Sequence, residues 1–308
     1  MSAGFDVLGL GAVAVDELIY VDHYPAPDEK AHVRRTGRQC GGLTATALVA
    51  AARFGAKCAY AGVLGDGDLS LFARDGMAKE GINLDHLLVK SEARPVHSYI
   101  IVDQTRGTRN IFADSRDAMG ADSNWPSAEL IRTSRVLFID HFGMAGMLRA
   151  ARIAREARIP VVADLERDVG PEFGELFKMV DHLVISFLFA RSLTGAADAR
   201  QAVEKLWSAE RNVVVVTDGA NGCWFRARET ASTVHQPAFK VNAVDTTGCG
   251  DVFHGVYAAA LAKGLPVQER IRLASAAAAL KATKPGGQSG IPNRDALEHF
   301  LLNPNRHS

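Results

Sequence analysis

The stretch DTTGCGDVFHG, residues 245–255, places two glycines, a cysteine and an aspartate directly before a long apolar run. Its first three residues favour turns and helix caps. The glycine–cysteine–glycine segment that follows offers consecutive backbone amides with little side-chain bulk, and we expect a helix to begin near Asp251. Free amides at a helix N-terminus, together with the helix dipole, attract anions. The stretch therefore predicts a site that could stabilise a phosphoryl group during its transfer.

Asp251 follows these amides, where its carboxylate could accept a proton from an attacking hydroxyl group. A purely structural interpretation is equally open for the stretch alone, because aspartate is favoured at helix N-termini and glycine is common in turns. Two more glycine-bearing segments favour the functional interpretation. VVVVTDGANG (213–222) indicates a buried strand ending in a turn, and KATKPGGQSGIP (281–292) follows the last long helical pattern. Together the three loops predict one convergent nucleotide pocket.

The remainder of the chain alternates short apolar strands with helices, which predicts a parallel sheet covered by helices on both faces. The expected strands are 58–63, 136–140, 160–163, 183–185 and 213–217, and the expected helices are 143–157, 198–209, 251–263 and 266–284. Two half-polar regions, at about 14–38 and 96–114, predict a small sheet exposed on one face. We expect one α/β domain over residues 1–308, with a three-layer α/β/α core and a small β-sheet lid.

The composition argues against several functions. The formal net charge is zero and no lysine or arginine run is present, so we expect no nucleic-acid partner. No apolar run reaches membrane-spanning length and nothing resembles a signal peptide, so we expect a cytoplasmic protein without a membrane partner. The four cysteines are scattered without a C-x-x-C pair, which fits a reducing compartment and argues against a zinc site.

Two earlier glycine segments allow more than one interpretation. GLGAVA (9–14) fits a dinucleotide fingerprint, but that fingerprint requires a helix next, and the following residues alternate like a strand. Close strand packing explains these glycines better. Asp16 and Glu17 then fall at a strand end, where parallel sheets bind ligands, although a solvated turn is as good an interpretation. CGG (40–42), before an alanine-rich helix, forms either a ligand-approach site or a tight loop.

In this order the motifs resemble those of the ribokinase-like (PfkB) family of sugar kinases, over nearly the whole chain. The resemblance rests on GLGAVAVDELIYVDHYPAPDEK, the CGG loop, GVLGDGD (62–68), VVVVTDGANG, VDTTGCGDVFHG and KPGGQSGIP. The last two motifs are the most specific. They look most like the sulfofructose kinase branch, and VISFLFARSLTG (184–195) is similar to the ketohexokinase branch.

The resemblance implies a β-sheet lid over a sugar that lies on an α/β core, with ATP and Mg²⁺ along the C-terminal half. Asp251 would be the catalytic base, and Arg109 on the lid would approach the phosphates or the sugar. The implied anion-hole amides are those of Gly248, Cys249 and Gly250; the implied sugar-binding residues are Asp16, Gly41, Gly42, Thr46 and Lys30; the implied ATP-binding residues are Thr217, Gly219, Gly222, Thr247 and Gly287. Asp245 and Thr247 lie where many relatives bind potassium.

Several positions depart from the family pattern. Cys249 stands where the family usually has alanine, a small change that leaves the amide intact, and Thr46 replaces a sugar-binding asparagine. At the potassium loop, Gly290 replaces a common serine. These departures leave both the identity of the sugar and the dependence on potassium open.

A further departure concerns magnesium. The N-x-x-E motif, which helps organise this ion in relatives, appears here as Ser186 and Phe189. We therefore expect Mg²⁺ to be held by ATP phosphates and water, or by other acids such as Asp164 or Glu166.

The predicted function is an ATP-dependent sugar kinase that phosphorylates a primary hydroxyl of a monosaccharide, a ketose or a related sugar. One alternative is a nucleoside kinase, with an aromatic acceptor pocket built from Tyr20, Tyr24, Tyr99 and Phe112. Another is a sugar-binding regulator whose kinase site has decayed, which the lost N-x-x-E motif suggests. The edge of a half-exposed lid needs cover, so we also expect a homodimer formed through the lids.

Overall fold

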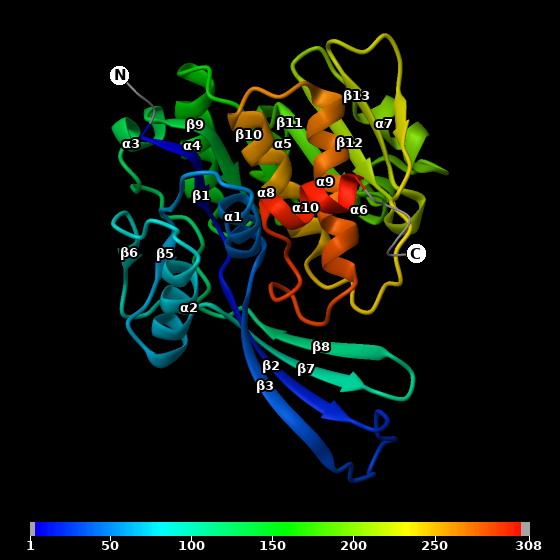
Figure 1. The fold of residues 1–308 in the computed structure, drawn as a ribbon. Coiled ribbons are helices and arrows are strands. Elements are labelled where there is room, and N and C mark those ends of the chain that lie inside the picture. Colours follow the sequence, from blue (N-terminus) through cyan, green and yellow to red (C-terminus); the bar gives the residue numbers. More distant parts are fainter. Residues whose placement is uncertain (1–3, 303–308) are drawn as a thin grey trace.

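The first strand of the molecule is buried on both faces. The computed structural model describes residues 4–302, and in β1 (Phe5–Leu10) Val7 joins one hydrophobic cluster while Leu8 and Leu10 join another. A strand of this kind needs a helical layer on each side. β1 lies in an eight-stranded sheet with the order β14-β13-β12-β11-β10-β9-β1-β4 (Figure 1). Its other strands are β4 (Cys58–Tyr60), β9 (Ser134–Ile139), β10 (Val161–Asp164), β11 (His182–Ser186), β12 (Val213–Thr217), β13 (Cys223–Ala227) and β14 (Val234–Gln236).

The sheet is mixed at one edge, so the prediction of an all-parallel sheet is wrong there. β4, β1, β9, β10, β11 and β12 run parallel, whereas β13 and β14 pair antiparallel. β12 and β13 are joined only by a short 3₁₀ turn at Gly219–Asn221. That connection is too short for the crossover that a parallel neighbour requires, so the chain must reverse.

Helices cover both faces, as the sequence predicts for a three-layer core. One layer holds α1 (Leu43–Arg53), α8 (Cys249–Ala262), α9 (Val267–Ala282) and α10 (Arg294–Leu302). The other holds α3 (Ala128–Arg132), α4 (Met144–Glu156), α5 (Phe173–Met179), α6 (Phe187–Thr194) and α7 (Ala199–Leu206). α1 and α8 approach closely at Gly255, where any Cβ would collide with the carbonyl of Ala47.

A second, four-stranded sheet projects from one end of the core (Figure 1). Its order is β3-β2-β7-β8, with β2 (Ala14–Val21), β3 (Val33–Gly41), β7 (Val96–Asp103) and β8 (Thr108–Asp114). β2 follows the glycines at 9–11 directly, so the helix that a dinucleotide fingerprint requires is absent there. Side chains alternate between the faces of a strand, and Asp16 of β2 lies beside Ser98 of β7 and Gln39 of β3.

The expected strand at 58–63 is divided. It ends as β4 at Tyr60, and a separate two-stranded sheet pairs β5 (Val63–Leu64) with β6 (Leu88–Val89) beside α2 (Asp68–Lys79). Gly62 marks the break, because a Cβ there would collide with the Tyr60 hydroxyl and the Gly120 carbonyl. Within residues 4–302, no helix combines the length and apolarity needed to cross a membrane.

Candidate active site

The N-terminus of α8 is built around a glycine that no other residue could replace without strain. Gly248 caps the helix with φ of 74°, and a Cβ there would lie 2.9 Å from the carbonyl oxygen of Gly287. The helix begins at Cys249, two residues earlier than expected, so Gly250 is its second residue. Amides in a first helical turn have no intrahelical acceptor. This helix end therefore presents backbone donors, aided by its dipole, to any bound anion.

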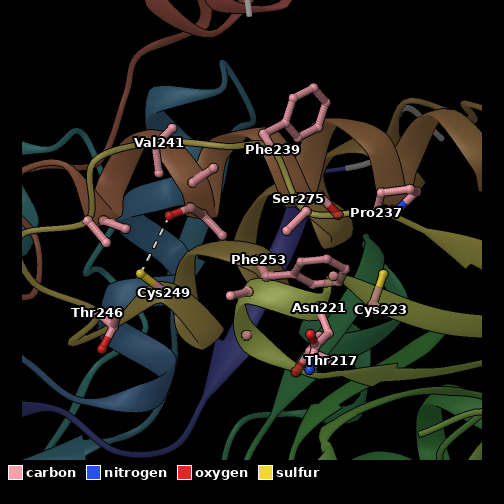
Figure 2. Close-up of a pocket in the computed structure, with 18 of the residues that line it drawn as sticks. Thr217, Asn221, Cys223, Pro237, Phe239, Val241, Thr246, Cys249, Phe253 and Ser275 are labelled. Carbon is pink, nitrogen blue, oxygen red and sulfur yellow. Dashed lines mark hydrogen bonds between the residues drawn. The ribbon is translucent and has the colours of Figure 1, made fainter. Parts of the chain in front are cut away.

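The amide of Cys249 donates to the carbonyl oxygen of Thr246 at 3.2 Å, and its thiol is not a reactive one. Its Sγ donates to the carbonyl of Ala278 at 3.4 Å, the dashed contact in Figure 2. Burial raises the pKa of the thiol to about 11. A neutral thiol that is already hydrogen-bonded is a poor nucleophile, so the cysteine fills the place of a small apolar residue.

Asp251, in the first turn of α8, shares a hydrogen bond with the side chain of Asp164 at the end of β10. Burial and the neighbouring carboxylates of Asp164 and Glu166 raise the pKa of Asp251 well above its usual value. Burial and Glu166 raise the pKa of Asp164 in the same direction. A hydrogen bond between two carboxyl groups needs a proton on one of them, so the pair titrates as a unit.

His254 supports this acidic pair from the next turn of α8. Its Nδ1 lies 2.7 Å from the carbonyl oxygen of Gly250 and 3.2 Å from Oδ2 of Asp164. Its Nε2 lies 2.8 Å from the carbonyl oxygen of Val184. These contacts fix the ring between α8, β10 and β11. The charge interaction with His254 lowers the pKa of Asp251 and so opposes the effect of burial in part.

A cavity of about 690 Å³ opens beside the start of α8. Cys249 and Gly250 line it from the start of α8, and Thr217, Gly219 and Gly222 line it from the end of β12. Figure 2 labels Cys249 and Thr217. The structure thus brings three of the predicted ATP-binding residues to the same cavity as two of the predicted anion-hole residues. Its volume lies within the range of small-molecule and cofactor sites.

The remaining wall of this cavity was not foreseen from the sequence. It includes Asn221, Pro237, Phe239, Val241, Phe253 and Ser275 (Figure 2). Pro237, Phe239 and Val241 come from the irregular segment after β14, and Asn221 belongs to the turn before β13. The sequence does give a signal for Phe253, because this residue follows Asp251 by two positions on the predicted helix 251–263.

Asp245 joins three segments next to the anion hole. Its Oδ1 accepts the Thr247 amide at 2.9 Å and the Thr247 hydroxyl at 2.7 Å. Its Oδ2 accepts the Gly286 amide at 2.8 Å. Burial opposes its ionisation, but these hydrogen bonds outweigh burial and lower the pKa of the carboxyl group. Arg109 of β8 completes the group, with a guanidinium nitrogen 3.3 Å from Oδ1.

Three of the predicted sugar-binding residues, Asp16, Gly41 and Gly42, lie together at the base of the lid. Asp16 is buried, and its carboxylate hydrogen-bonds with Ser98 and Gln39. Burial, which these bonds offset only in part, raises its pKa. A Cβ on Gly41 would lie 2.6 Å from Oδ2 of Asp16, and Gly42 has φ of 97° with its Cα against the backbone of 12–14. Glycine at 41 lets the chain pass close to this carboxylate, and glycine at 42 lets it pass close to the backbone of 12–14.

Gln39 connects the base of the lid with the anion-hole loops. Its side chain hydrogen-bonds with Asp16, and its Oε1 occupies the space where a Cβ on Gly286 would stand. Gly286 in turn donates to Asp245. The candidate acceptor side and the candidate phosphate side are therefore neighbours, although they are more than two hundred residues apart in sequence.

Other predicted site residues have different surroundings. Thr46 is buried on α1, and its hydroxyl accepts a hydrogen bond from Nε2 of Gln288 at 3.1 Å. Lys30 is exposed in the connection between β2 and β3, and its sugar-binding role stays a prediction. Ser186, at the place of the family asparagine, caps α6 by accepting the Phe189 amide at 3.3 Å.

Sequence reasoning missed a buried carboxylate that shapes the first glycine turn. Asp140, directly after β9, accepts the amides of Ala12 at 2.6 Å and Phe142 at 2.8 Å. It also accepts the Thr44 hydroxyl at 2.8 Å. Burial, only partly offset by these hydrogen bonds, raises its pKa to about 6. No motif signals this role, since the residues involved lie up to 128 positions apart.

Sequence and structure comparisons agree on one family. The model of the pfkB family carbohydrate kinases matches residues 10–294. A ribokinase of Haemophilus influenzae is 29% identical over 304 residues, which cover 95% of this chain and 97% of the relative. A crystal structure of a putative ribokinase from Agrobacterium tumefaciens has a TM-score of 0.89 at 29% identity, covering 99% of this chain and 100% of the other. An Arabidopsis thaliana ribokinase complexed with ribose and ATP has a TM-score of 0.83 at 21% identity, covering 98% and 99%. The chain therefore belongs to the pfkB family of carbohydrate kinases, which are phosphotransferases with an alcohol acceptor.

Proposed function

We propose that the chain transfers the γ-phosphoryl group of ATP to a primary hydroxyl group of a monosaccharide, with Asp251 as the general base. One observation carries this proposal: the first turn of α8 supplies both the residues that line the 690 Å³ cavity, Cys249 and Gly250, and the half-buried side chain of Asp251. A base and an anion-binding site on the same helical turn can act on one reacting centre.

Each residue of the site has a separate role in the proposed reaction. The hydroxyl of the sugar donates its proton to Asp251, whose raised pKa makes it a stronger base than an ordinary aspartate. The amides at 248–250 hold the transferring group as its charge develops. Arg109 provides a second positive charge beside the same loop. The sheet of β2, β3, β7 and β8 covers the reaction, with Asp16 at its base holding the acceptor.

Mg²⁺ would be held mainly by the phosphates of ATP. Among residues 4–302, no cluster of three or more His, Cys, Asp or Glu side chains is arranged to hold a metal ion. Mg²⁺ commonly keeps several waters and takes only one or two carboxylates in phosphate sites, and Asp164 and Glu166 fit that smaller role. When bound, the ion neutralises charge on the phosphoryl oxygens.

The relatives favour an aldopentose as the first acceptor to test. The Haemophilus influenzae relative is named a ribokinase, and the Arabidopsis thaliana structure contains ribose. The ketose suggested by the sequence stays a prediction, since other similar proteins are named fructokinases. The hydroxyl of Thr46, where relatives have a sugar-binding asparagine, is already bonded to Gln288. A pocket that differs at this position calls for a panel that includes ketoses and anionic sugars beside ribose.

The aromatic pocket of a nucleoside kinase finds no support in the lid. Tyr99 pairs with Glu17 and Phe112 across the sheet, so these residues lie on the face opposite to Asp16. Tyr20 shares the face of Asp16, but the Arg35 guanidinium lies 3.7 Å from the centre of its ring.

The test of the proposal is Asp251→Asn, with ADP formation measured in ATP and Mg²⁺ against a panel of sugars. We expect turnover to fall by about 10²–10⁴-fold, the usual contribution of a general base. Asp295→Asn is the matched control, because Asp295 lies in the first turn of α10 and should leave turnover unchanged. Folded Asp251→Asn protein that turns over like the control would exclude Asp251 as the base. Wild-type protein that binds a sugar but never forms ADP would instead identify a decayed regulator.

We also propose that a second copy of the chain covers the outer face of the lid. Tyr99 and Phe112 are neighbours on that face and are 45% and 53% exposed. Two large apolar side chains beside the exposed edge strand β8 are a contact that a symmetric dimer would bury.

A further inference from the structure

Lys281 is a fully buried lysine for which the proposed reaction gives no role. It lies in the last turn of α9, within the otherwise apolar run AAAALKA. Its ammonium group donates to the carbonyl oxygen of Asp245 at 2.8 Å. A buried ammonium group is costly unless it is paired, so this lysine must find compensation from the loop that it contacts. That loop leads directly into the anion hole.

The end of α9 and the start of this loop are joined at several points. The amides of Val244 and Asp245 donate to the carbonyl of Ala282 at 2.7 and 3.0 Å. The Lys281 ammonium group bonds the Asp245 carbonyl on the other side of the same residue. Three residues later Gly248 turns into α8, with its Cα against the carbonyl of Gly287. A shift of the Asp245 backbone would therefore move the amides at 248–250.

The oxygen atoms of Asp245 do not fit the potassium ion that many relatives bind. The carbonyl oxygen already accepts from Lys281, and Oδ1 already accepts two bonds from Thr247 and contacts Arg109. Gly290 packs tightly as well, since a Cβ there would lie 2.8 Å from the carbonyl oxygen of Lys281. Two protein cations thus occupy the surroundings of Asp245 that a metal cation would need.

We propose that Lys281 is a positioning residue that serves as a built-in monovalent cation and fixes the anion-hole loop, so that turnover does not depend on potassium. This inference rests on the proposed function. The ammonium group carries the same charge as K⁺ but is tied covalently to α9. It therefore holds the Asp245 carbonyl at all salt concentrations, and the amides that follow keep their direction toward the phosphoryl group.

The test compares Lys281→Met and Lys281→Ala with the wild type in KCl, NaCl and tetramethylammonium chloride. Wild-type turnover should be the same in all three salts. Lys281→Met, which keeps the length but loses the charge, should lower kcat at least tenfold with KM for ATP changed less than threefold. Lys281→Ala leaves space for a small cation, so K⁺ or methylammonium should restore its kcat at least fivefold in a saturable way.

The matched control is Lys263→Met. The Lys263 ammonium group also donates to a backbone carbonyl, that of Phe54, at 2.8 Å. A lysine that only stabilises the fold should lower thermal stability without any response to the choice of cation. Wild-type turnover that rises fivefold or more with K⁺ would overturn the proposal. So would a folded Lys281→Met protein with the kcat of the wild type.

Thermal unfolding separates this inference from the proposed function. If the wild type forms no ADP with any sugar, the proposed function fails, but the melting temperature of Lys281→Ala can still be measured without substrate. A specific increase with K⁺ over tetramethylammonium, absent in the wild type and in Lys263→Met, supports the built-in cation. Equal melting temperatures in both salts overturn it. If Lys281→Ala does not fold, Lys281→Arg takes its place in the test. Because arginine keeps the positive charge, Lys281→Arg should preserve kcat in all three salts. A kcat of Lys281→Arg as low as that of Lys281→Met overturns the proposal.

Discussion

Replacing Gly250 by alanine should separate stability from activity. Gly250 is the second residue of α8, has no positive φ, and a Cβ built on it meets no atom within 4 Å. The substitution is therefore free of steric cost in the protein. Alanine in place of a helical glycine stabilises by about 0.5–1 kcal/mol. For a chain of 308 residues this corresponds to an increase in melting temperature of about 1–2 °C.

The added methyl group nevertheless enters the wall of the cavity where the phosphoryl group would approach the amides. Alanine keeps the amide, but its methyl group would hold the phosphoryl group away from that donor. Because the interaction with one such donor is typically worth about 10²–10³-fold in kcat, we expect a decrease in that range. The assays are thermal unfolding for stability, and ADP formation together with calorimetric titration of ATP for function.

Gly174→Ala is the control. Gly174 is likewise the second residue of its helix, α5, and its Cβ would also meet nothing within 4 Å. It does not line the cavity. Both variants should gain similar stability, and only Gly250→Ala should lose activity. If the two variants have kcat/KM values within threefold of each other, the amides of α8 do not receive the transferring group.

Three further predictions follow from the described contacts. The acid limb of the pH profile of kcat/KM should lie above the usual aspartate range, because Asp251 must be ionised to act and its pKa is raised. Asp164→Asn removes one of the carboxylates that raise this pKa, so it should move the limb to lower pH. Asp140 has a folded pKa of about 6 against 3.8 ordinarily, so the native state binds its proton more tightly and wild-type stability falls as pH rises through this window. Denaturant unfolding should show Asp140→Asn gaining up to about 3 kcal/mol relative to wild type between pH 4 and 7, and a difference that is constant with pH contradicts this. Tyr99→Lys combined with Phe112→Lys should convert a dimer to a monomer in light scattering, and an unchanged mass would place the interface elsewhere.

The anion-binding turn was accessible to sequence reasoning because its physics is local. Glycines at 248 and 250 and the aspartate at 251 predict a helix start with exposed amides, whatever surrounds them. The approach of Gly41 to Asp16 was less visible. It depends on the pairing of β2 with β3, which brings residues 25 positions apart into contact. The reversal at β13 could have been read from the short turn between two strands, but the composition of both strands suits either direction.

The layered α/β architecture and the glycine turn before α8 follow from the sequence alone, because backbone freedom, helix capping and hydrophobic periodicity are encoded within a few neighbouring residues. The same local pattern suggests Asp251 as the base, which stays a prediction. The distant groups that contact that turn could not be read from the sequence, because the packing of the whole fold brings them there. Asp164 reaches Asp251 through the order of the sheet, His254 bonds a carbonyl 70 residues away, and Lys281 meets Asp245 through the packing of α9. Periodicity marks Lys281 only as one polar residue in an apolar helix. The role proposed for Lys281 depends on the Asp245 carbonyl that its ammonium group contacts. The packing of the whole fold sets the position of that carbonyl.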